Sequence, residues 1–183
     1  MIDKWEIVIG CEIHTQLLTK TKAFCACENR YGGMPNTRVC PVCLGLPGAM
    51  PRISKGYVEL GAVAGQALNC HIARFTKFDR KHYFYPDLTK GYQITQYDDP
   101  INGAGYIEIT FGPKDHLQKK KIGIHHAHLE EDAAKSSHED SYSLVDYNRA
   151  GSPLLEIVSE PDMRSPEEAR MYVEKLRNVL RYI

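Results

Sequence analysis

The sequence predicts an α+β fold with a mainly antiparallel sheet and flanking helices. Strand-like segments outnumber helical ones, and most follow one another directly instead of alternating with helices, which disfavours a βαβ arrangement. Hydrophobic residues make up 43% of the 183 positions, which is enough for a core in one domain or a domain and a half.

The first expected element is a strand over residues 5–17, where apolar and polar residues alternate. Its polar side carries Glu12, His14 and Gln16. This side is either a solvated face or a metal site, because a carboxylate beside an imidazole can bind a cation such as Mg²⁺.

The middle of the chain is expected to hold one helix, a mostly irregular stretch and four strands. Ser54 is the predicted cap of a helix that reaches about Asn69, and residues 77–100 are expected to be irregular. The expected strands are residues 105–111, 119–129, 142–147 and 154–158, the first two joined as a hairpin through a turn at 112–115.

The last element is the clearest helix. Ser165, Pro166 and Glu168 supply an N-cap, a first-turn proline and a capping-box glutamate. Apolar residues then recur at helical spacing up to Ile183, where no cap or proline follows. The chain is therefore expected to be part of a longer protein.

Four cysteines form two close pairs, Cys25 with Cys27 and Cys40 with Cys43, separated by a segment rich in turn-forming residues. Each pair can place two sulfurs about 2.3 Å from one ion, so a closed Zn²⁺ site with four thiolates is favoured over two disulfides or four ordinary buried thiols. The expected zinc-binding loop is residues 24–45.

Composition excludes several classes of protein. The formal net charge is 0, so the overall field does not attract nucleic acid. No apolar run approaches about 18 residues, which predicts no membrane span. Residues 1–6 lack the pattern of a secretory signal, which predicts a cytoplasmic protein with reduced thiols. Phosphate-loop, dinucleotide and nucleophile-elbow motifs do not occur.

A second acidic cluster lies at residues 128–132, His-Leu-Glu-Glu-Asp, after an apolar approach. Consecutive carboxylates repel one another unless a cation neutralises them, so this is either a metal site or a polar turn. His125 and His126 precede the cluster, and strand alternation predicts that they and His128 do not all face it.

Glu156 interrupts the apolar run 154–158. A buried glutamate needs a partner, and the two alternatives are a metal ion and a salt bridge with Arg149.

Cations and aromatic residues alternate from Lys77 to Gln93, and the central ones are Arg80, Lys81 and Tyr83. Such a pattern can hold phosphates and a stacked base, or it can be a tyrosine-rich surface loop.

Several long motifs together resemble the B-subunit of the bacterial aspartyl/glutamyl-tRNA(Asn/Gln) amidotransferase. They are residues 9–14, 78–87, 128–132 and 156–162, in the same order and spread over essentially the whole chain. Because members of this family are much longer, residues 1–183 are expected to be the N-terminal part of its cradle domain, without the C-terminal helical and tail domains that hold tRNA.

The resemblance implies a glutamine synthetase-like catalytic fold and a ligase. ATP would phosphorylate the side-chain carboxylate of glutamate or aspartate mischarged on tRNA(Gln) or tRNA(Asn), and ammonia would then form the amide. The ammonia would come from a glutaminase, the A-subunit, and a small C-subunit would complete the heterotrimer.

By motif, the candidate residues fall into three sets. The catalytic residues and Mg²⁺ ligands are Glu12, His14, Glu130 and Glu131, with Glu156 as a further ligand, and the contacts to ATP or the tRNA end are Arg80, Lys81 and Tyr83. The carboxylates suit phosphoryl transfer, which needs positioning and charge neutralisation more than a protein nucleophile.

The competing hypothesis is a zinc-containing RNA-binding module without catalytic activity. A groove for RNA is lined by Lys and Arg, so the acidic face favours the enzyme. The 183-residue chain by itself is expected to be inactive, because part of the expected site lies beyond Ile183.

Overall fold

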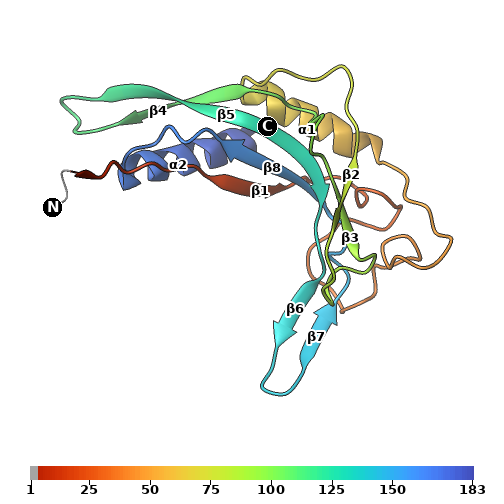
Figure 1. Cartoon of the computed structure of the whole chain (residues 1–183). Helices are drawn as coiled ribbons and strands as arrows, with labels where there is room; N and C mark the ends of the chain where they lie inside the picture. Colours follow the sequence, from red (N-terminus) through yellow and green to blue (C-terminus); the bar gives the residue numbers. More distant parts are fainter. Residues whose placement is uncertain (1–3) are drawn as a thin grey trace.

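The computed structural model describes residues 4–183. Residues 1–3, part of the segment behind the signal-peptide prediction, lie outside the described residues. In chain order the elements are β1 (Glu12–Gln16), α1 (Lys55–Ala67), β2 (Asp79–His82), β3 (Tyr92–Thr95), β4 (Gly105–Phe111), β5 (Gln118–Glu131), β6 (Lys135–His138), β7 (Ser143–Asp146), β8 (Pro153–Ser159) and α2 (Pro166–Tyr182) (Figure 1).

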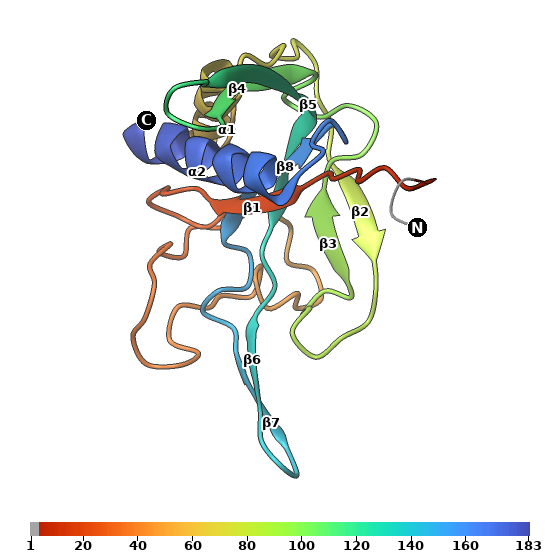
Figure 2. The ribbon, with the colours of Figure 1, turned by 90° about the vertical axis from the view of Figure 1, so that its left-hand side faces the viewer.

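A four-stranded sheet with the order β1-β8-β5-β4 forms the centre of the molecule. All its neighbouring strands are antiparallel, as are those of the two-stranded ribbons β2-β3 and β6-β7. The α+β class with a mainly antiparallel sheet is therefore confirmed. The β6-β7 ribbon projects away from the central sheet (Figure 2).

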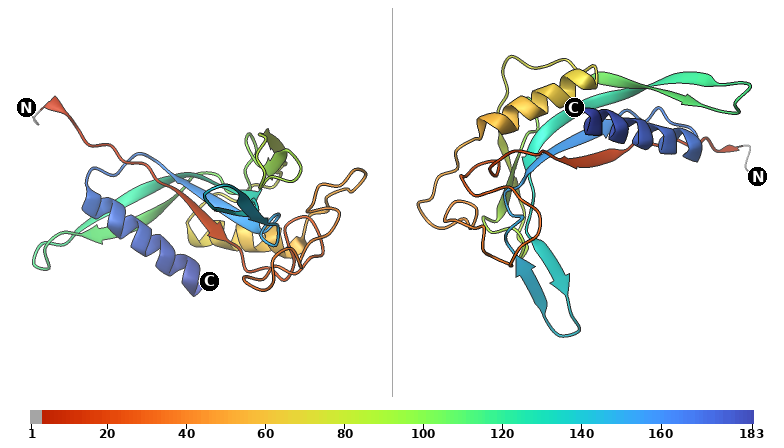
Figure 3. Two further views of the ribbon diagram at one scale, coloured as in Figure 1. Left: turned by 90° about the horizontal axis from the view of Figure 1, so that it is seen from below. Right: turned by 180° about the vertical axis from the view of Figure 1, so that it is seen from behind.

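Both helices pack against one face of the central sheet, and the β2-β3 ribbon lies on the other side (Figure 3). Apolar side chains of α1, α2 and the inner sheet face form one core, which includes Tyr57, Leu129, Ile157 and Tyr172. Because successive strand residues point to opposite faces, this core leaves the alternate residues of β1, β5 and β8 facing the ribbon.

Close packing at Gly61 and Gly65 explains the glycines of α1. A Cβ atom at Gly61 would lie 2.6 Å from a methyl group of Leu129, and one at Gly65 would lie 1.9 Å from Oδ1 of the buried Asn102. The helix can therefore approach β5 closely only where it has no side chain.

Ser54 stands at the N-cap position of α1, as predicted, but its side chain makes no capping hydrogen bond. The cap of α2 follows the prediction with one difference. Ser165 Oγ accepts a hydrogen bond from the Glu168 N–H, as a capping box requires. Glu168 reaches back to the N–H of Arg164 instead of Ser165, and it also binds Lys120.

Two sequence predictions about strands are wrong in part. The strand expected over residues 5–17 is paired only at Glu12–Gln16, apart from an isolated bridge at Ile9, and Trp5 is 85% exposed. Its partner β8 ends at Ser159 and is followed by Pro161, so no strand continues beside the first residues. The stretch 77–100, expected to be irregular, contains β2 and β3.

No helix in the described part of the chain is both long enough and apolar enough to cross a membrane.

Candidate functional site

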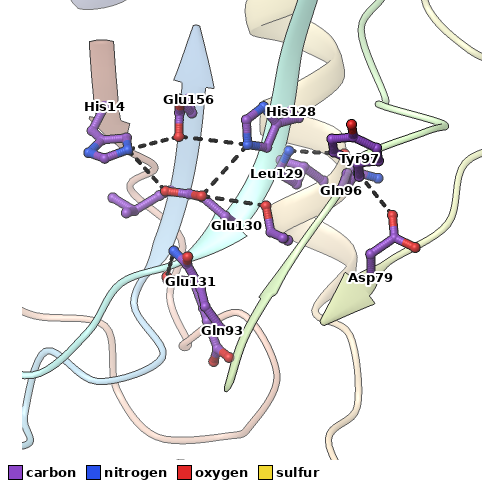
Figure 4. A network of polar contacts seen from close by, with 12 residues as sticks. His14, Asp79, Gln93, Gln96, Tyr97, His128, Leu129, Glu130, Glu131 and Glu156 are labelled. Atoms are coloured by element: carbon purple, nitrogen blue, oxygen red, sulfur yellow. Dashed lines mark hydrogen bonds and ion pairs between the residues drawn. The ribbon is translucent and has the colours of Figure 1, made fainter. Parts of the chain in front are cut away.

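The side chains of His14, Glu130 and Glu156, from three neighbouring strands, meet on the sheet face that looks toward the β2-β3 ribbon (Figure 4). His14 on β1 is the register partner of Glu156 on β8, which is in turn the register partner of His128 on β5. His14 Nε2 lies 3.0 Å from Glu156 Oε2 and 3.1 Å from Glu130 Oε1. The structure therefore brings together three of the five residues predicted as Mg²⁺ ligands.

The spacing of these atoms suits a hard cation. One ligand atom from each of His14, Glu130 and Glu156 lies within 4.8 Å of the other two. Adjacent ligands of an octahedral Mg²⁺ ion are about 3 Å apart, since each lies roughly 2.0–2.1 Å from the metal. The same distances suit a protonated His14 between two carboxylates, so the residues present fit either a metal ion or an ion pair.

A cavity of about 780 Å³ opens beside this cluster and is lined by its Glu130 and Glu156 but not by His14. Glu12, Glu130 and Glu156 line its acidic side, and the β2-β3 ribbon contributes Arg80 and Lys81 to the other side. Among the residues that the structure describes, neither of these two cations forms an ion pair with a carboxylate. The Arg80 guanidinium lies over the ring of Tyr92, 4.6 Å from its centroid. The cavity thus offers a ligand both carboxylates and positive charge that no carboxylate neutralises.

Glu12 and Tyr83 differ in their relation to the cavity. Glu12 lies two residues before His14 on the same strand face, and its side chain is exposed to the cavity. Tyr83 is outside the cavity lining, although burial and then the nearby charges of Asp87 and Glu130 raise the pKa of its hydroxyl. The structure therefore places Glu12 with the acidic cluster and Tyr83 beside it.

Glu131 points away from the cluster. Strand alternation turns it away from Glu130, and at this end of β5 strand β3 reaches both side chains. Glu131 Oε1 lies 2.6 Å from Lys90 Nζ and accepts a hydrogen bond from the N–H of Ile94. Both side chains of the pair are nearly inaccessible to solvent. Glu131 is thus part of a buried ion pair that attaches the ribbon to the end of β5.

Arg149 is not the partner of Glu156, so the predicted alternative of a salt bridge between them is wrong. Arg149 Nε lies 3.4 Å from Asp132 Oδ2, and its guanidinium donates hydrogen bonds to the carbonyls of Ala133 and Ala134. The partners of Glu156 are the imidazoles of His14 and His128, the latter at 3.7 Å.

The three histidines of β5 all line the cavity, which the strand alternation did not predict. His126 shares the face of His128 by alternation, and the register shift of β5 against β8 between Ile124 and His126 is a bulge that also brings His125 to the cavity. His126 Nε2 lies 3.1 Å from His128 Nδ1. Burial, and then the neighbouring imidazoles, lower the pKa of His126 to about 4.

The sequence reasoning did not find Gln96, a buried residue that supports the cavity wall. Its Oε1 accepts hydrogen bonds from the N–H groups of Leu129 and Ile101, which fixes the loop after β3 to β5. A single polar residue in a stretch expected to be irregular gave no signal for this role.

The four cysteines of the loop 24–45 also come together. Cys25, Cys27, Cys40 and Cys43 place their sulfurs within 4.8 Å of one another. All are free thiols, so the alternative of two disulfides is wrong for this structure. Cys43 Sγ lies 4.0 Å from Cys27 Sγ and 3.9 Å from Cys40 Sγ, close to the roughly 3.8 Å edge of a tetrahedral Zn²⁺ site with 2.3 Å bonds.

Local hydrogen bonds shape the second pair of cysteines into a tight turn. The Cys40 N–H points at Cys43 Sγ, 3.2 Å away, and the N–H groups of Leu44 and Gly45 bond the carbonyls of Cys40 and Val42. A hydrogen bond from Cys25, and then the Cys40 N–H and the charge of Lys22, lower the pKa of Cys43 to about 4. The residues present therefore fit a metal that binds thiolates.

Comparison with known proteins gives one family and close relatives. The model of the GatB/GatE catalytic domain matches residues 7–183. The chain is 62% identical over 182 residues to the B-subunit of the aspartyl/glutamyl-tRNA(Asn/Gln) amidotransferase of Treponema denticola, covering 98% of the chain and 37% of that protein. The proteins of the same name from Treponema pallidum and Moorella thermoacetica are 59% and 56% identical, again over 98% of the chain and over 35% and 38% of their lengths.

Proposed function

Since this chain belongs to the GatB/GatE catalytic domain family, we propose that it is the N-terminal catalytic part of a tRNA-dependent amidotransferase subunit. The chain spans about 37% of the length of the relative from Treponema denticola. The rest of the cradle domain, of the glutamine synthetase type, and the helical and tail domains that bind tRNA would then follow residue 183.

The reaction that we propose has two steps. An oxygen of the side-chain carboxylate of glutamate or aspartate, attached to tRNA(Gln) or tRNA(Asn), takes the terminal phosphoryl group of ATP, and ADP leaves. Ammonia then attacks the acyl carbon, inorganic phosphate leaves with the bonding electrons, and the amide loses a proton to solvent. A glutaminase, the A-subunit, supplies the ammonia, and the small C-subunit completes the assembly.

The convergence of His14, Glu130 and Glu156 beside a cavity that also holds Arg80 and Lys81 is the observation that carries this proposal. These three residues would hold Mg²⁺, with Glu12 beside them on the same face. When bound, Mg²⁺ neutralises phosphate oxygens and orients them for in-line transfer.

The chain's own residues would do three things in the first step. The carboxylates fix the cation at one side of the cavity, and Arg80 and Lys81 attract the phosphates from the other side. The contacts of His14 with Glu130 and Glu156 would hold these ligand atoms close together. Gln96 and the Lys90–Glu131 pair keep the ribbon that carries both cations at a fixed distance from β5.

We propose a structural role for Cys25, Cys27, Cys40 and Cys43. A closed Zn²⁺ site with four thiolates leaves no position for a reacting water, so it would order the loop 24–45 instead of taking part in the reaction. The loop lies next to the ribbon, since Thr89 Oγ1 donates a hydrogen bond to the Cys43 carbonyl.

The test uses the complete enzyme and measures ATP cleavage that depends on mischarged tRNA together with amide formation. Glu130→Gln and Glu12→Gln keep the size of each side chain and remove its charge. We expect Glu130→Gln to lower both rates by about a hundredfold or more, the scale seen when one electrostatic group is lost from a transition state. Glu59→Gln, an exposed position on α1, is the matched control and leaves both rates unchanged.

Two outcomes would contradict the proposal. Unchanged ATP cleavage in Glu130→Gln would remove the site from the phosphoryl transfer. Binding of tRNA by the wild-type enzyme without any ATP cleavage would favour the RNA-binding module instead.

A further inference from the structure

Lys22 is a fully buried lysine, with 0% of its surface exposed to solvent. Its backbone N–H donates to the Cys27 carbonyl, which places the residue directly beside the first cysteine pair. Its ammonium group lies 3.3 Å from the carbonyl oxygen of Tyr147 and 3.6 Å from Cys43 Sγ. Lysine is rarely buried so completely without a partner of opposite charge.

No carboxylate supplies that partner. Among residues 4–183, Lys22 takes part in no ion pair with Asp or Glu. The Glu131 carboxylate is close by, since its Oε2 and the Lys22 Cδ would lie 3.7 and 3.8 Å from a Cβ atom on Gly151, but Glu131 is paired with Lys90. A buried ammonium without an anionic partner is expensive, because an unpaired charge loses its hydration on burial. The charge of Lys22 therefore calls for an anion close to Cys43.

A metal-bound group of four thiolates supplies such an anion. Zn²⁺ with four deprotonated cysteines formally carries two net negative charges, and outer groups that donate hydrogen bonds to the ligands stabilise it. Cys43 is the most buried of the four sulfurs and already receives the N–H of Cys40 at 3.2 Å. Lys22 adds a second donor to the same sulfur, this one with a full positive charge.

We propose that Lys22 is a positioning residue of the four-cysteine site, where its buried ammonium compensates the negative charge of the metal-thiolate group and holds Cys43 through an N–H···S contact. This inference rests on the proposed binding of zinc by the four cysteines. It assigns to Lys22 a function that is separate from the phosphoryl transfer site.

The experiment measures metal affinity in the complete protein that contains this chain. The zinc content is measured first, and the dissociation constant for Zn²⁺ is then obtained by competition with a chromogenic chelator. Lys22→Met keeps the length of the side chain and removes its charge, while Lys22→Gln also keeps an N–H donor for the Tyr147 carbonyl. We expect both variants to bind Zn²⁺ about 10- to 100-fold more weakly than the wild type, the usual effect of losing an outer-shell partner.

A spectroscopic readout separates this role from a purely structural one. In the Co²⁺-loaded protein the sulfur-to-metal charge-transfer band moves to lower energy in Lys22→Met, because the Cys43 sulfur becomes more electron-rich when its charged donor is removed. Lys20→Met, an exposed lysine two residues earlier, is the matched control and leaves the affinity and the band unchanged.

The outcomes distinguish the two proposals. A wild-type protein that binds no zinc would overturn the zinc site and this inference with it. A wild-type protein that binds zinc, with Lys22 variants of the same affinity and the same Co²⁺ band, would overturn the role of Lys22 alone. If Lys22→Met does not fold, Lys22→Gln decides the question by the same two measurements.

Discussion

His14 stands directly opposite Glu156 across the β1-β8 pair, with its Nε2 atom 3.0 Å from the carboxylate. The strand register alone fixes this relationship, because residues that are partners in an antiparallel pair project from the same face of the sheet. Glu130, two residues after His128 on β5, projects from that face as well and completes the cluster.

The Lys90–Glu131 pair makes a prediction about stability. Lys90→Met removes the cation and leaves the Glu131 carboxylate buried without a partner of opposite charge. We expect the free energy of unfolding, measured with urea, to fall by about 3–5 kcal/mol. The double variant Lys90→Met/Glu131→Gln recovers most of that loss, and a double variant as unstable as Lys90→Met would contradict the pairing.

The glycines of α1 allow a comparison within one helix. Gly65→Ala places a Cβ atom against the buried side chain of Asn102, so we expect a loss of about 1–3 kcal/mol from overpacking. Gly56→Ala meets no atom within 4 Å, and the higher helix propensity of alanine should stabilise the protein by about 0.5–1 kcal/mol. Thermal unfolding of the two variants checks both signs, and a stabilising Gly65→Ala would refute the close contact.

Glu168, at the start of α2, should make the stability of the fold depend on pH. Hydrogen bonds from Lys120 first, and from the Arg164 N–H, lower the pKa of Glu168 from its ordinary value of 4.5. The ionised Glu168 therefore stabilises the folded chain. Its full contribution is present above pH 4.5, the ordinary pKa, and it is lost as the pH falls through the lower pKa of the folded state. Glu168→Gln should cost about 1.5–3 kcal/mol at neutral pH, because hydrogen bonds to a charged group are lost.

The pH series supplies the check on that assignment. The difference in unfolding free energy between the wild type and Glu168→Gln should shrink as the pH falls below 4.5. Glu59→Gln, an exposed residue of α1 that meets only the exposed Lys55, serves as the control and should change stability by less than about 0.5 kcal/mol. A difference for Glu168→Gln that does not vary with pH would contradict the role of the charge.

Local patterns predicted much of this fold. The start of α1 after Ser54, the cap at Ser165 and the hairpin formed by β4 and β5 agree with the sequence because short-range signals specify them. The ribbon β2-β3 could not be predicted, since four-residue strands with mixed polar residues carry no clear period. The first paired residue of β1 is Glu12 because β8 stops at Ser159, so this boundary depends on another strand.

In the candidate site, too, local patterns predicted some features and contacts between distant residues determined the others. Alternation along the first strand placed Glu12 and His14 on one face, and the structure agrees. The bulge before His126 is a single-residue irregularity in a 14-residue strand, and Gly123 just before it is the sequence signal that could have indicated it. The partners of Glu131 and Lys22 lie far away in the sequence, so only the folded chain reveals them.

The central claim is that His14, Glu130 and Glu156 bind a divalent cation. The most direct measurement loads the complete protein with Mn²⁺ in place of Mg²⁺ and records its electron spin echo. We predict modulation from the nitrogen of one directly bound imidazole, which is lost in His14→Gln and retained in His138→Gln, a histidine of the projecting ribbon. Bound Mn²⁺ without nitrogen modulation, or modulation that persists in His14→Gln, would contradict the claim.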